Sequence, residues 1–345
     1  MKNFWKKLKK PIFCLAPMAD VTDCAFRQII AKYGKPDVFW TEFVSADGLT
    51  HEKGKKKLLV DLQFLKNEHP IVAQLFGSNP KNMKKAAALC KKLGFDGIDI
   101  NMGCPDKSIE KQNSGAAMMK NPKLAKMMIK SAKEGAKGLP ISVKTRIGYY
   151  NTDMEWIKNL LEEDISALTV HLRTRKEMSK VPAHWELMRE IVKMRNKINK
   201  DILIIGNGDI TDINDARKKY KETGCDGVML GRAIFGNPFL FNEKRRPFEF
   251  FVPEGPTLVP SMRPKKGAGA KNLKGRNLIN EKLKILIEHT KLFEKKLGKV
   301  KSFNIMKKHF KAYVNGFDGA KELRTKLMET KNAKGVEKII KEFLK

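Results

Sequence analysis

Cys104 is the residue of this chain whose surroundings most suggest chemistry. It lies in the run Asn101-Met102-Gly103-Cys104-Pro105, directly after a short apolar segment. Glycine before it and proline after it hold the loop open and fix the direction of the thiol. Such a thiol is a nucleophile if its pKa is lowered, or a proton donor if its pKa stays near about 8.5. No catalytic-triad spacing surrounds it, so we favour a proton donor, which requires that another group supplies the electrons.

Polar residues also follow the other short apolar segments of the chain. In chain order they are Pro17-Met18-Ala19, Glu42, Gln74, Asn101 with Cys104, Lys144 with Arg146, His171, Asn207-Gly208-Asp209 and Gly231-Arg232. One polar residue at a strand end is ordinary, because strands end in loops. Eight successive cases favour a polar ligand bound where these ends converge. Lys144 and His171 could then hydrogen-bond the polar edge of a bound ring, although each alone is more often solvated or structural.

Two of these loops contain the glycines that a phosphate site needs. They are Gly206-Asn207-Gly208-Asp209 and Gly231-Arg232-Ala233. Glycine lets backbone amides approach a phosphate closely, and a helix that begins near Ala233 would point its positive end there. Each glycine alone could form only a tight turn. The two loops together favour a phosphate, carried by a phosphorylated substrate or by flavin mononucleotide (FMN).

Eight apolar segments can be read as the strands that position these residues. They are Ile12–Ala16, Val38–Phe43, Ile71–Phe76, Gly97–Asn101, Ile141–Thr145, Ala167–His171, Ile202–Gly206 and Gly227–Leu230. Most are continuously apolar, which is typical of parallel strands covered by helices. Amphipathic stretches separate them, and Asn79-Pro80 and Asn121-Pro122 are predicted helix starts. Eight such units predict a (β/α)8 TIM barrel, which we prefer to a doubly wound open sheet.

The chain changes character after residue 243. Residues 244–275 contain five prolines and four glycines with little periodicity, which indicates a linker or extended loop. Helical periodicity returns over 276–345. The predicted domains are therefore a catalytic barrel over 1–243 and a small C-terminal helical domain over 276–345.

The net charge of this 345-residue chain is +32, and it is concentrated toward the C-terminus. Residues 244–345 carry +17, whereas the longer remainder carries +15. Such an excess indicates a polyanionic partner, either nucleic acid or a membrane surface. The sequence contains no apolar window long enough to span a membrane and no long signal-peptide core. The five cysteines form no CxxC motif, so neither a disulfide framework nor a metal site is predicted, and we expect a cytoplasmic protein.

Eight short sequence motifs follow one another along the chain in a specific order. They are Ala16-Pro17-Met18-Ala19-Asp20-Val21-Thr22-Asp23, Thr41-Glu42-Phe43-Val44-Ser45-Ala46, Gln74-Leu75-Phe76-Gly77, Asp99-Ile100-Asn101-Met102-Gly103-Cys104-Pro105, Val143-Lys144-Thr145-Arg146-Ile147-Gly148, His171-Leu172-Arg173-Thr174-Arg175, Asn207-Gly208-Asp209 and Gly231-Arg232-Ala233. This ordered set resembles the tRNA-dihydrouridine synthases, flavin enzymes that reduce uridine in tRNA with NADPH. Met306-Lys307-Lys308-His309 and Tyr313 are similar to the family's tail motif. Glu177 and His184 depart from the family, which usually has glutamine and aspartate there.

The resemblance implies FMN as cofactor, NADPH or NADH as reductant and tRNA as partner, with no obligatory protein partner. It implies that residues 276–345 bind tRNA and that hydride reaches C6 of uracil while Cys104 protonates C5. The implied flavin-binding residues are Pro17, Met18, Ala19 and Gln74 at the ring, Lys144 and His171 at its polar edge, and Asn207, Gly208, Asp209, Gly231 and Arg232 at the phosphate. Asn101 and Arg146 match the residues that hold the uracil.

Two other functions remain open at this level. A flavin-dependent barrel reductase of a free pyrimidine or another small molecule would explain the flavin residues but not the basic tail. A non-catalytic RNA-binding protein would explain the tail but not the ordered polar residues at the strand ends.

Overall fold

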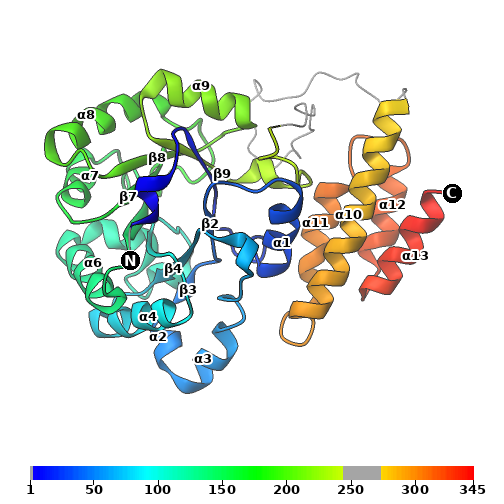
Figure 1. Ribbon diagram of the computed structural model, residues 1–345, viewed down its shortest axis with the longest axis horizontal. Coiled ribbons are helices and arrows are strands. Elements are labelled where there is room, and N and C mark those ends of the chain that lie inside the picture. Colours follow the sequence, from blue (N-terminus) through cyan, green and yellow to red (C-terminus); the bar gives the residue numbers. More distant parts are fainter. Residues whose placement is uncertain (1–2, 244–272) are drawn as a thin grey trace. The chain divides into compact units, whose positions relative to one another are not determined.

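The computed structural model describes residues 3–243 and 273–345 (Figure 1). The predicted linker 244–275 lies outside the described residues, except for its last three residues, which begin a helix. Contacts divide the described residues into two compact units, 3–18 with 36–231 and 19–35 with 232–243 and 273–345. This division differs from the predicted domain limits because it places 19–35 and 232–243 with the helical tail.

The first unit is a barrel of parallel strands. In spatial order the strands are β1 (Ile12–Leu15), β9 (Gly227–Leu230), β8 (Leu203–Asn207), β7 (Ala167–His171), β6 (Ile141–Arg146), β5 (Gly97–Met102), β4 (Ile71–Phe76) and β2 (Phe39–Trp40), and the short β3 (Val44–Ser45) also pairs with β4. A bridge between Cys14 and Val38 joins the two ends, where Leu15 N donates to Val38 O at 3.3 Å. The predicted TIM barrel is therefore confirmed.

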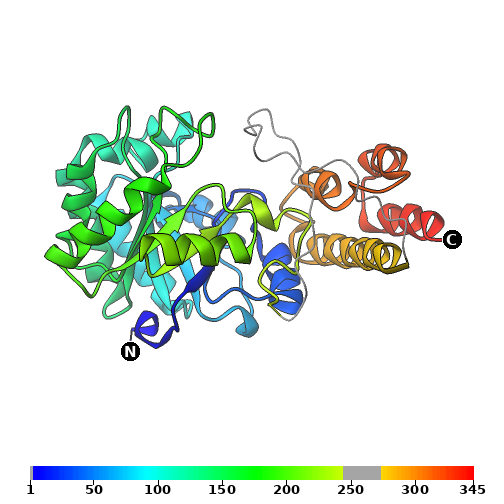
Figure 2. The same ribbon diagram turned by 90° about the horizontal axis from the view of Figure 1, so that it is seen from above.

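Helices surround the strands of this unit (Figures 1 and 2). They are η1 (Phe4–Lys7), α2 (Ala46–Thr50), α3 (Glu52–Leu58), η2 (Lys66–Glu68), α4 (Pro80–Lys92), α5 (Lys107–Glu110), η3 (Gly115–Lys120), α6 (Pro122–Ala136), α7 (Met154–Leu161), η4 (Trp185–Leu187), α8 (Met188–Ile198) and α9 (Ile213–Thr223). Both predicted helix starts are confirmed: Asn79 Oδ1 accepts from Lys81 N at 3.0 Å, and Asn121 Oδ1 accepts from Leu124 N at 3.1 Å.

The second predicted strand, Val38–Phe43, is shorter than expected. Only Phe39–Trp40 forms β2. The cause is a side chain that replaces a backbone acceptor, because Gln74 N donates to Thr41 Oγ1 at 3.1 Å. The ladder is interrupted there, and pairing with β4 resumes at Val44.

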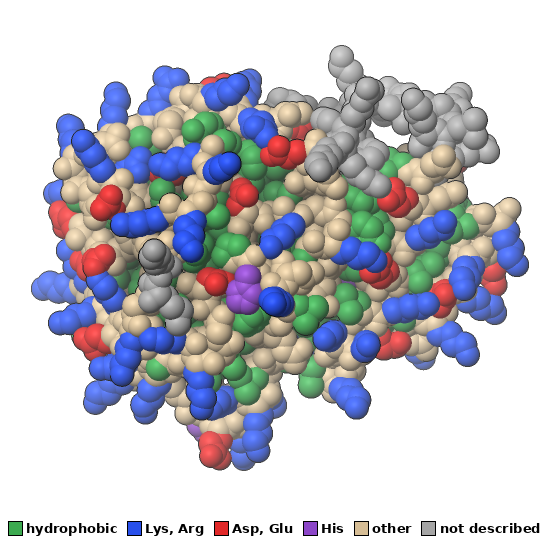
Figure 3. Space-filling model, viewed as in Figure 1, with side chains coloured by type: hydrophobic (Ala, Val, Ile, Leu, Met, Phe, Trp, Pro, Cys, Tyr) green, Lys and Arg blue, Asp and Glu red, His purple; other side chains and the backbone are tan. Residues whose placement is uncertain are grey.

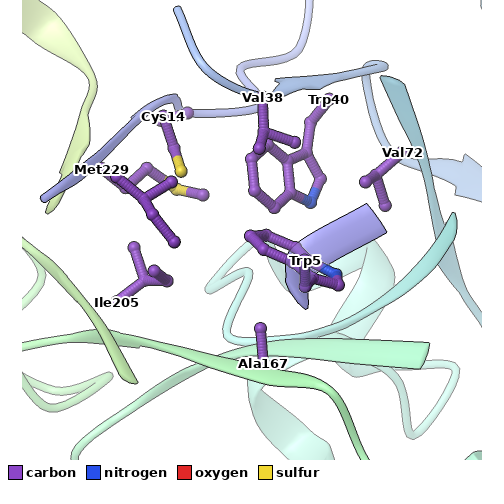
Figure 4. Close-up of a cluster of buried hydrophobic side chains, with 10 residues drawn as sticks. Trp5, Cys14, Val38, Trp40, Val72, Ala167, Ile205 and Met229 are labelled. Atoms are coloured by element: carbon purple, nitrogen blue, oxygen red, sulfur yellow. The ribbon is translucent and has the colours of Figure 1, made fainter. Parts of the chain in front are cut away.

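Apolar side chains fill the barrel interior and support the polar strand ends. The cluster consists of Trp5, Ile12, Cys14, Ala16, Val38, Trp40, Val72, Ala167, Ile205 and Met229 (Figure 4). Trp5 of η1 is 3% exposed and lies 5.8 Å, centroid to centroid, from Trp40. Because η1 precedes β1, it covers the amino ends of the strands, and the carboxyl ends remain available for a site.

The second unit is helical. It comprises α1 (Cys24–Tyr33), η5 (Arg232–Ile234), α10 (Leu273–Leu297), η7 (Phe303–Ile305), α11 (Met306–Tyr313), α12 (Ala320–Met328) and α13 (Ala333–Phe343). Phe26 of α1 stacks on His289 of α10 at 5.0 Å and contacts the ring of His309 edge-on at 4.7 Å. This contact explains why α1 belongs with the tail. Within the described residues, no helix is long and apolar enough to cross a membrane.

Candidate active site

Strand register aligns the polar residues at the carboxyl ends of the barrel. Asn101 pairs with Lys144 across β5 and β6, and Arg146 pairs with His171 across β6 and β7. His171 in turn pairs with Asn207 across β7 and β8. Paired residues on neighbouring strands point to the same face of a sheet. The structure therefore brings these five predicted residues together.

A buried hydrogen-bond chain lies just below them. Ser142 Oγ donates to Asp99 Oδ1 at 2.6 Å, and Gln74 Nε2 donates to Asp99 Oδ2 at 2.7 Å. Asn101 Nδ2 then donates to Gln74 Oε1 at 3.1 Å. Gln74 and Asp99 are fully buried, and this burial raises the pKa of Asp99 to about 6. Gln74 is thus held from below by a carboxylate and holds Asn101 above it.

This chain ends at the backbone of Cys104. Asn101 Oδ1 accepts from Gly103 N at 3.1 Å and from Cys104 N at 2.9 Å. On the other side, Ala116 N donates to Cys104 O at 2.8 Å. Gly115 has a φ of +60°, and a Cβ there would lie 2.7 Å from Cys104 O. The loop that carries the thiol is therefore fixed at both peptide groups of Cys104.

The Cys104 side chain is half-buried. Burial raises the pKa of its thiol above the ordinary value, and Asp106 and the nearby cations have smaller effects. A raised pKa keeps the proton on sulfur at neutral pH. Partial burial of the thiol thus agrees with the proton donor that the sequence predicts, and the role itself stays a prediction.

Arg146 connects the loop of Cys104 to the loop that follows β7. Its Nε donates to Gly103 O at 2.9 Å, and its Nη1 donates to Thr174 O at 3.1 Å and Met178 O at 3.2 Å. Burial, with the neighbouring Arg173, lowers the pKa of Arg146 to about 10, so it stays charged at neutral pH. Its Nη2 donates to none of the described residues. That group remains available for a ligand carbonyl.

Lys144 lies on β6 with Arg146, and His171 ends the next strand, β7. Lys144 Nζ donates to Asn207 Oδ1 at 3.3 Å, while Asn207 Nδ2 donates to Met229 O at 2.8 Å. Burial lowers the pKa of Lys144 to about 8. His171 Nε2 lies 3.4 Å from Arg173 Nη1. A buried amine and an imidazole thus lie at the same end of the barrel.

The two glycine loops differ in their surroundings: Gly206 and Gly208 after β8 are buried, whereas Gly231 after β9 is partly exposed. Gly208 has a φ of +133°, and a Cβ there would lie 2.7 Å from Ala183 Cβ. The Asp209 carboxylate accepts from Arg173 Nη2 and from Ala183 N, so it is already paired. A Cβ at Gly231 would meet nothing closer than 3.7 Å. The backbone at Gly231 is therefore open to the close approach of a ligand phosphate, whereas Gly208 packs against Ala183.

The remaining predicted residues lie at the limits of the barrel unit. Pro17 and Met18 follow β1, and Met18 Sδ lies 3.9 Å from where a Cβ of Gly231 would be. Ala19 and Arg232 are exposed and belong to the second unit.

Comparison with known proteins identifies the family. The sequence model described as dihydrouridine synthase matches residues 14–345. The chain belongs to the dihydrouridine synthase family. Enzymes of this family are oxidoreductases that act on a CH–CH group with a nicotinamide reductant, and this chain is such an enzyme and flavin-dependent.

Two curated relatives are similar over nearly their whole length. A probable tRNA-dihydrouridine synthase of Staphylococcus aureus (strain Mu50) is 38% identical over 345 residues, which cover 99% of this chain and 96% of the relative. The probable tRNA-dihydrouridine synthase 2 of Bacillus subtilis (strain 168) is 39% identical over 344 residues, covering 99% and 97%. Among solved structures, a 2-naphthoyl-CoA reductase complex matches with a TM-score of 0.52 at 12% identity, over 70% of this chain and 52% of that one. This last likeness concerns the fold alone.

Glu177 and His184, which we expect from the sequence to depart from the family pattern, contact each other. His184 Nε2 lies 2.9 Å from Glu177 Oε1, and Glu177 Oε2 accepts from Thr174 N at 2.7 Å. The hydrogen bond to Glu177 raises the pKa of His184. In this member of the family, an acidic and a basic side chain thus form one pair that ties the loop after β7.

Sequence reasoning assigned no role to Asp99, Ser142 or Arg173. A signal for Asp99 exists, because a carboxylate interrupts an apolar strand two residues before Asn101 and so points to the same face. Ser142 and Arg173 carry no such signal. Their roles follow from pairing across strands that only the fold supplies.

Asp99→Ala is expected to destabilise the barrel by about 2–4 kcal/mol, because it leaves the buried Gln74 amide and Ser142 hydroxyl without their acceptor. Urea unfolding followed by tryptophan fluorescence measures this loss. The exposed Asp201→Ala is the control and should change stability by less than about 0.5 kcal/mol. Equal stability of the two variants would contradict a structural role for the buried chain.

Proposed function

We propose that this protein reduces the C5=C6 bond of uridine in tRNA, in the cytoplasm, with FMN as cofactor and NADPH as reductant. The observation that carries the proposal is the thiol of Cys104, held through Asn101 at the barrel mouth beside Lys144 and Arg146, in a chain of this family. The names of the relatives support tRNA as the substrate.

The electronic structure of uracil assigns the steps. Its C5=C6 bond is conjugated to the C4 carbonyl, so hydride addition at C6 moves negative charge toward C5 and O4. Reduced flavin, when bound, supplies this hydride. Cys104 donates its proton to C5. The Nη2 group of Arg146 donates to a uracil carbonyl and stabilises the charge that develops there, an effect that is strong in a site shielded from water.

The predicted flavin-binding residues would hold FMN in place. Pro17, Met18 and Ala19 would line the ring system, and Lys144 and His171 would bond its polar edge. The loops Asn207-Gly208-Asp209 and Gly231-Arg232 would hold its ribityl phosphate. Gln74 acts mainly through Asn101, since its amide is engaged with Asp99 and Asn101.

The charge of the surface fits a nucleic acid partner. Lys and Arg side chains outnumber Asp and Glu over the visible face (Figure 3). A stacked uridine must be extruded to reach Cys104, at a cost of a few kcal/mol. Pairing of lysines with phosphates supplies sequence-independent affinity that offsets this cost.

Oxidation of NADPH by the purified yellow protein tests the proposal. It should depend on unmodified tRNA, and nucleoside analysis should show dihydrouridine in the product. Uridine or a DNA oligonucleotide should not replace tRNA. Equal turnover with free uridine would indicate a small-molecule reductase, and a protein that binds no flavin would contradict catalysis.

Neutralising three exposed lysines of the tail should weaken tRNA binding and reduce its salt dependence. The variant changes Lys331, Lys334 and Lys338 to glutamine. Each lost phosphate contact should flatten the slope of log K against log salt by about 0.7–0.9. The matched control changes Lys130, Lys133 and Lys137, at the end of α6 on the amino side of the strands. An equal loss of slope in both variants would contradict a tail-specific role.

A further inference from the structure

A cavity of about 340 Å³ lies among the loops that follow β4, β5 and β6. Its polar lining includes Glu110, Asn113, Lys120, Asn121 and Tyr149. These loops stand at the carboxyl ends of the strands, as does Cys104. The residues proposed to bind the flavin and the uracil do not line this cavity, and its volume is within the range of small-ligand sites.

Aromatic and cationic side chains meet at one wall of this cavity, which Lys120 and Tyr149 line and beside which Tyr150 and Arg175 contact Tyr149. Lys120 Nζ lies 3.9 Å from the centroid of the Tyr149 ring and 5.5 Å from that of Tyr150. The Arg175 guanidinium lies 5.4 Å from the Tyr149 centroid. The two tyrosine rings meet edge-on at 4.7 Å, and Tyr150 is 62% exposed. Single-stranded nucleic acids are bound by such walls, where aromatic faces stack bases and cations pair with phosphates.

Acceptors and donors are also in place for the edge of a base. Arg175 Nε donates to Glu110 Oε1 at 2.8 Å, which holds this carboxylate at the cavity. Asn121 uses its Oδ1 to cap α6, and its amide nitrogen remains as a donor. A carboxylate and an amide can bond amino and carbonyl groups of several bases, which suits recognition with little sequence preference.

The cavity is linked to the thiol by one short helix. Ala116 N of η3 donates to Cys104 O, and the last residue of η3 is Lys120. On the opposite side, Lys176 N donates to Tyr149 O at 2.9 Å, and Arg175 N donates to Gly148 O at 2.9 Å. The cavity walls are therefore built from the loops that also position Cys104 and Arg146.

We propose that this cavity receives a nucleotide that neighbours the target uridine in the RNA chain. Its base stacks on Tyr149 and Tyr150, and its phosphate pairs with Lys120, whereas Arg175 stays paired with Glu110. The proposal rests on the proposed function, because it takes a polynucleotide to be the molecule that delivers uridine to Cys104. A stacked neighbour replaces part of the stacking that extrusion of the uridine removes.

Rapid kinetics of the full-length holoenzyme separate the two half-reactions. Tyr150→Ala should slow oxidation of the reduced flavin by limiting tRNA about ten-fold, the effect of losing one stacking platform. Tyr150→Phe should be close to the unchanged protein, since it keeps the aromatic face. Both variants should be reduced by NADPH at the normal rate. Met127→Ala is the control, because Met127 is a 54% exposed apolar residue on the outer helix α6.

A second measurement does not depend on turnover. tRNA carrying 4-thiouridine beside the target position is irradiated with the full-length protein, and cross-linked peptides are found by mass spectrometry. The proposal expects a cross-link on the tryptic peptide 147–158, which contains both tyrosines. Competition by unlabelled tRNA should remove it.

The possible results distinguish the two proposals. Slower reduction by NADPH in Tyr150→Ala, with normal oxidation by tRNA, would place the nicotinamide dinucleotide in the cavity and overturn the inference. Unchanged kinetics together with no cross-link to this peptide would also overturn it. A cross-link in a protein whose flavin tRNA never oxidises would uphold the cavity's ligand while contradicting the proposed reaction.

Discussion

Cys104→Ala should keep its flavin and its reduction by NADPH but lose uridine reduction by roughly two to four powers of ten, the range for a positioned general acid. Neither flavin binding nor flavin reduction needs a proton donor on the far face of the base. Cys104→Ser should be nearly as inactive, because a hydroxyl is a much weaker acid than a thiol. Stopped-flow measurement of each half-reaction separates the effects.

Activity alone does not separate an acid from a nucleophile, so the position of the solvent proton decides. In heavy water, the product should carry deuterium at C5 and the flavin-derived hydride at C6, as read by mass spectrometry and NMR. Cys225→Ala, which removes a buried thiol elsewhere in the barrel, is the matched control and should retain turnover. Full turnover by Cys104→Ala, or solvent deuterium at C6, would contradict the assignment.

Much of the barrel could be predicted because local signals agree with the fold. Ile71–Phe76, Ala167–His171 and Gly227–Leu230 match their predicted bounds, since each is a short, mainly apolar run. The strand predicted at Ile202–Gly206 begins and ends one residue later. Ile202 N donates to Asn199 O at 3.3 Å, so this residue still belongs to the preceding turn. Periodicity alone does not carry that information.

The position of α1 could not be predicted from its place in the chain. It follows β1 and precedes β2, which makes it the first barrel helix by order. Its burial, however, is against the helices of the tail, where Tyr33 Oη donates to Glu288 Oε2 at 2.6 Å. A partner that lies 255 residues away has no local signature. Removing the tail would therefore expose Phe26, so charge substitutions are a cleaner test than truncation.

In the candidate site, too, some features could be predicted from the sequence and others could not. The positions of Asn101, Lys144 and His171 at strand ends can be predicted from the sequence, because polar residues occur where each apolar run ends. The hydrogen-bond partners of these side chains cannot be predicted from the sequence. Asn101 was expected to hold the uracil, yet its Oδ1 and Nδ2 are used to position Cys104 and to bond Gln74. Its role toward the base stays a prediction.

Two buried histidines should make the helical unit sensitive to acid. His289 and His309 are fully buried, their rings lie 4.5 Å apart, and none of their nitrogens bonds to any of the described residues. Burial lowers the pKa of His309 to about 3, with Lys308 adding to the effect. Burial, with His309, lowers the pKa of His289 well below its ordinary value. The folded unit therefore holds both rings neutral.

The sign of the pH effect follows from proton counting. In the unfolded chain each histidine titrates near about 6.5, so below that pH the unfolded state binds more protons than the folded state. The contribution of the two neutral histidines to folding stability is fully present above about pH 6.5. It is lost as the pH falls toward the folded pKa values. At pH 5, about 1.5 pH units below the unfolded pKa, the two histidines would together lower the free energy of unfolding by about 4 kcal/mol. Each lowers it by about 1.4 kcal/mol per pH unit. This window lies above the titration of ordinary carboxylates.

Hydrogen exchange at pH 7 and pH 5, corrected for intrinsic rates, should show α10 and α11 losing protection while the barrel strands keep theirs. His309→Leu replaces an unbonded ring by an apolar side chain of similar size, so it should be near neutral at pH 7 and should remove about half of the pH effect. The control His184→Gln changes a partly exposed histidine of the barrel and should leave α10 and α11 unaffected. Equal protection of these helices at both pH values, or a full pH effect in His309→Leu, would show that the buried rings do not govern the unit's stability.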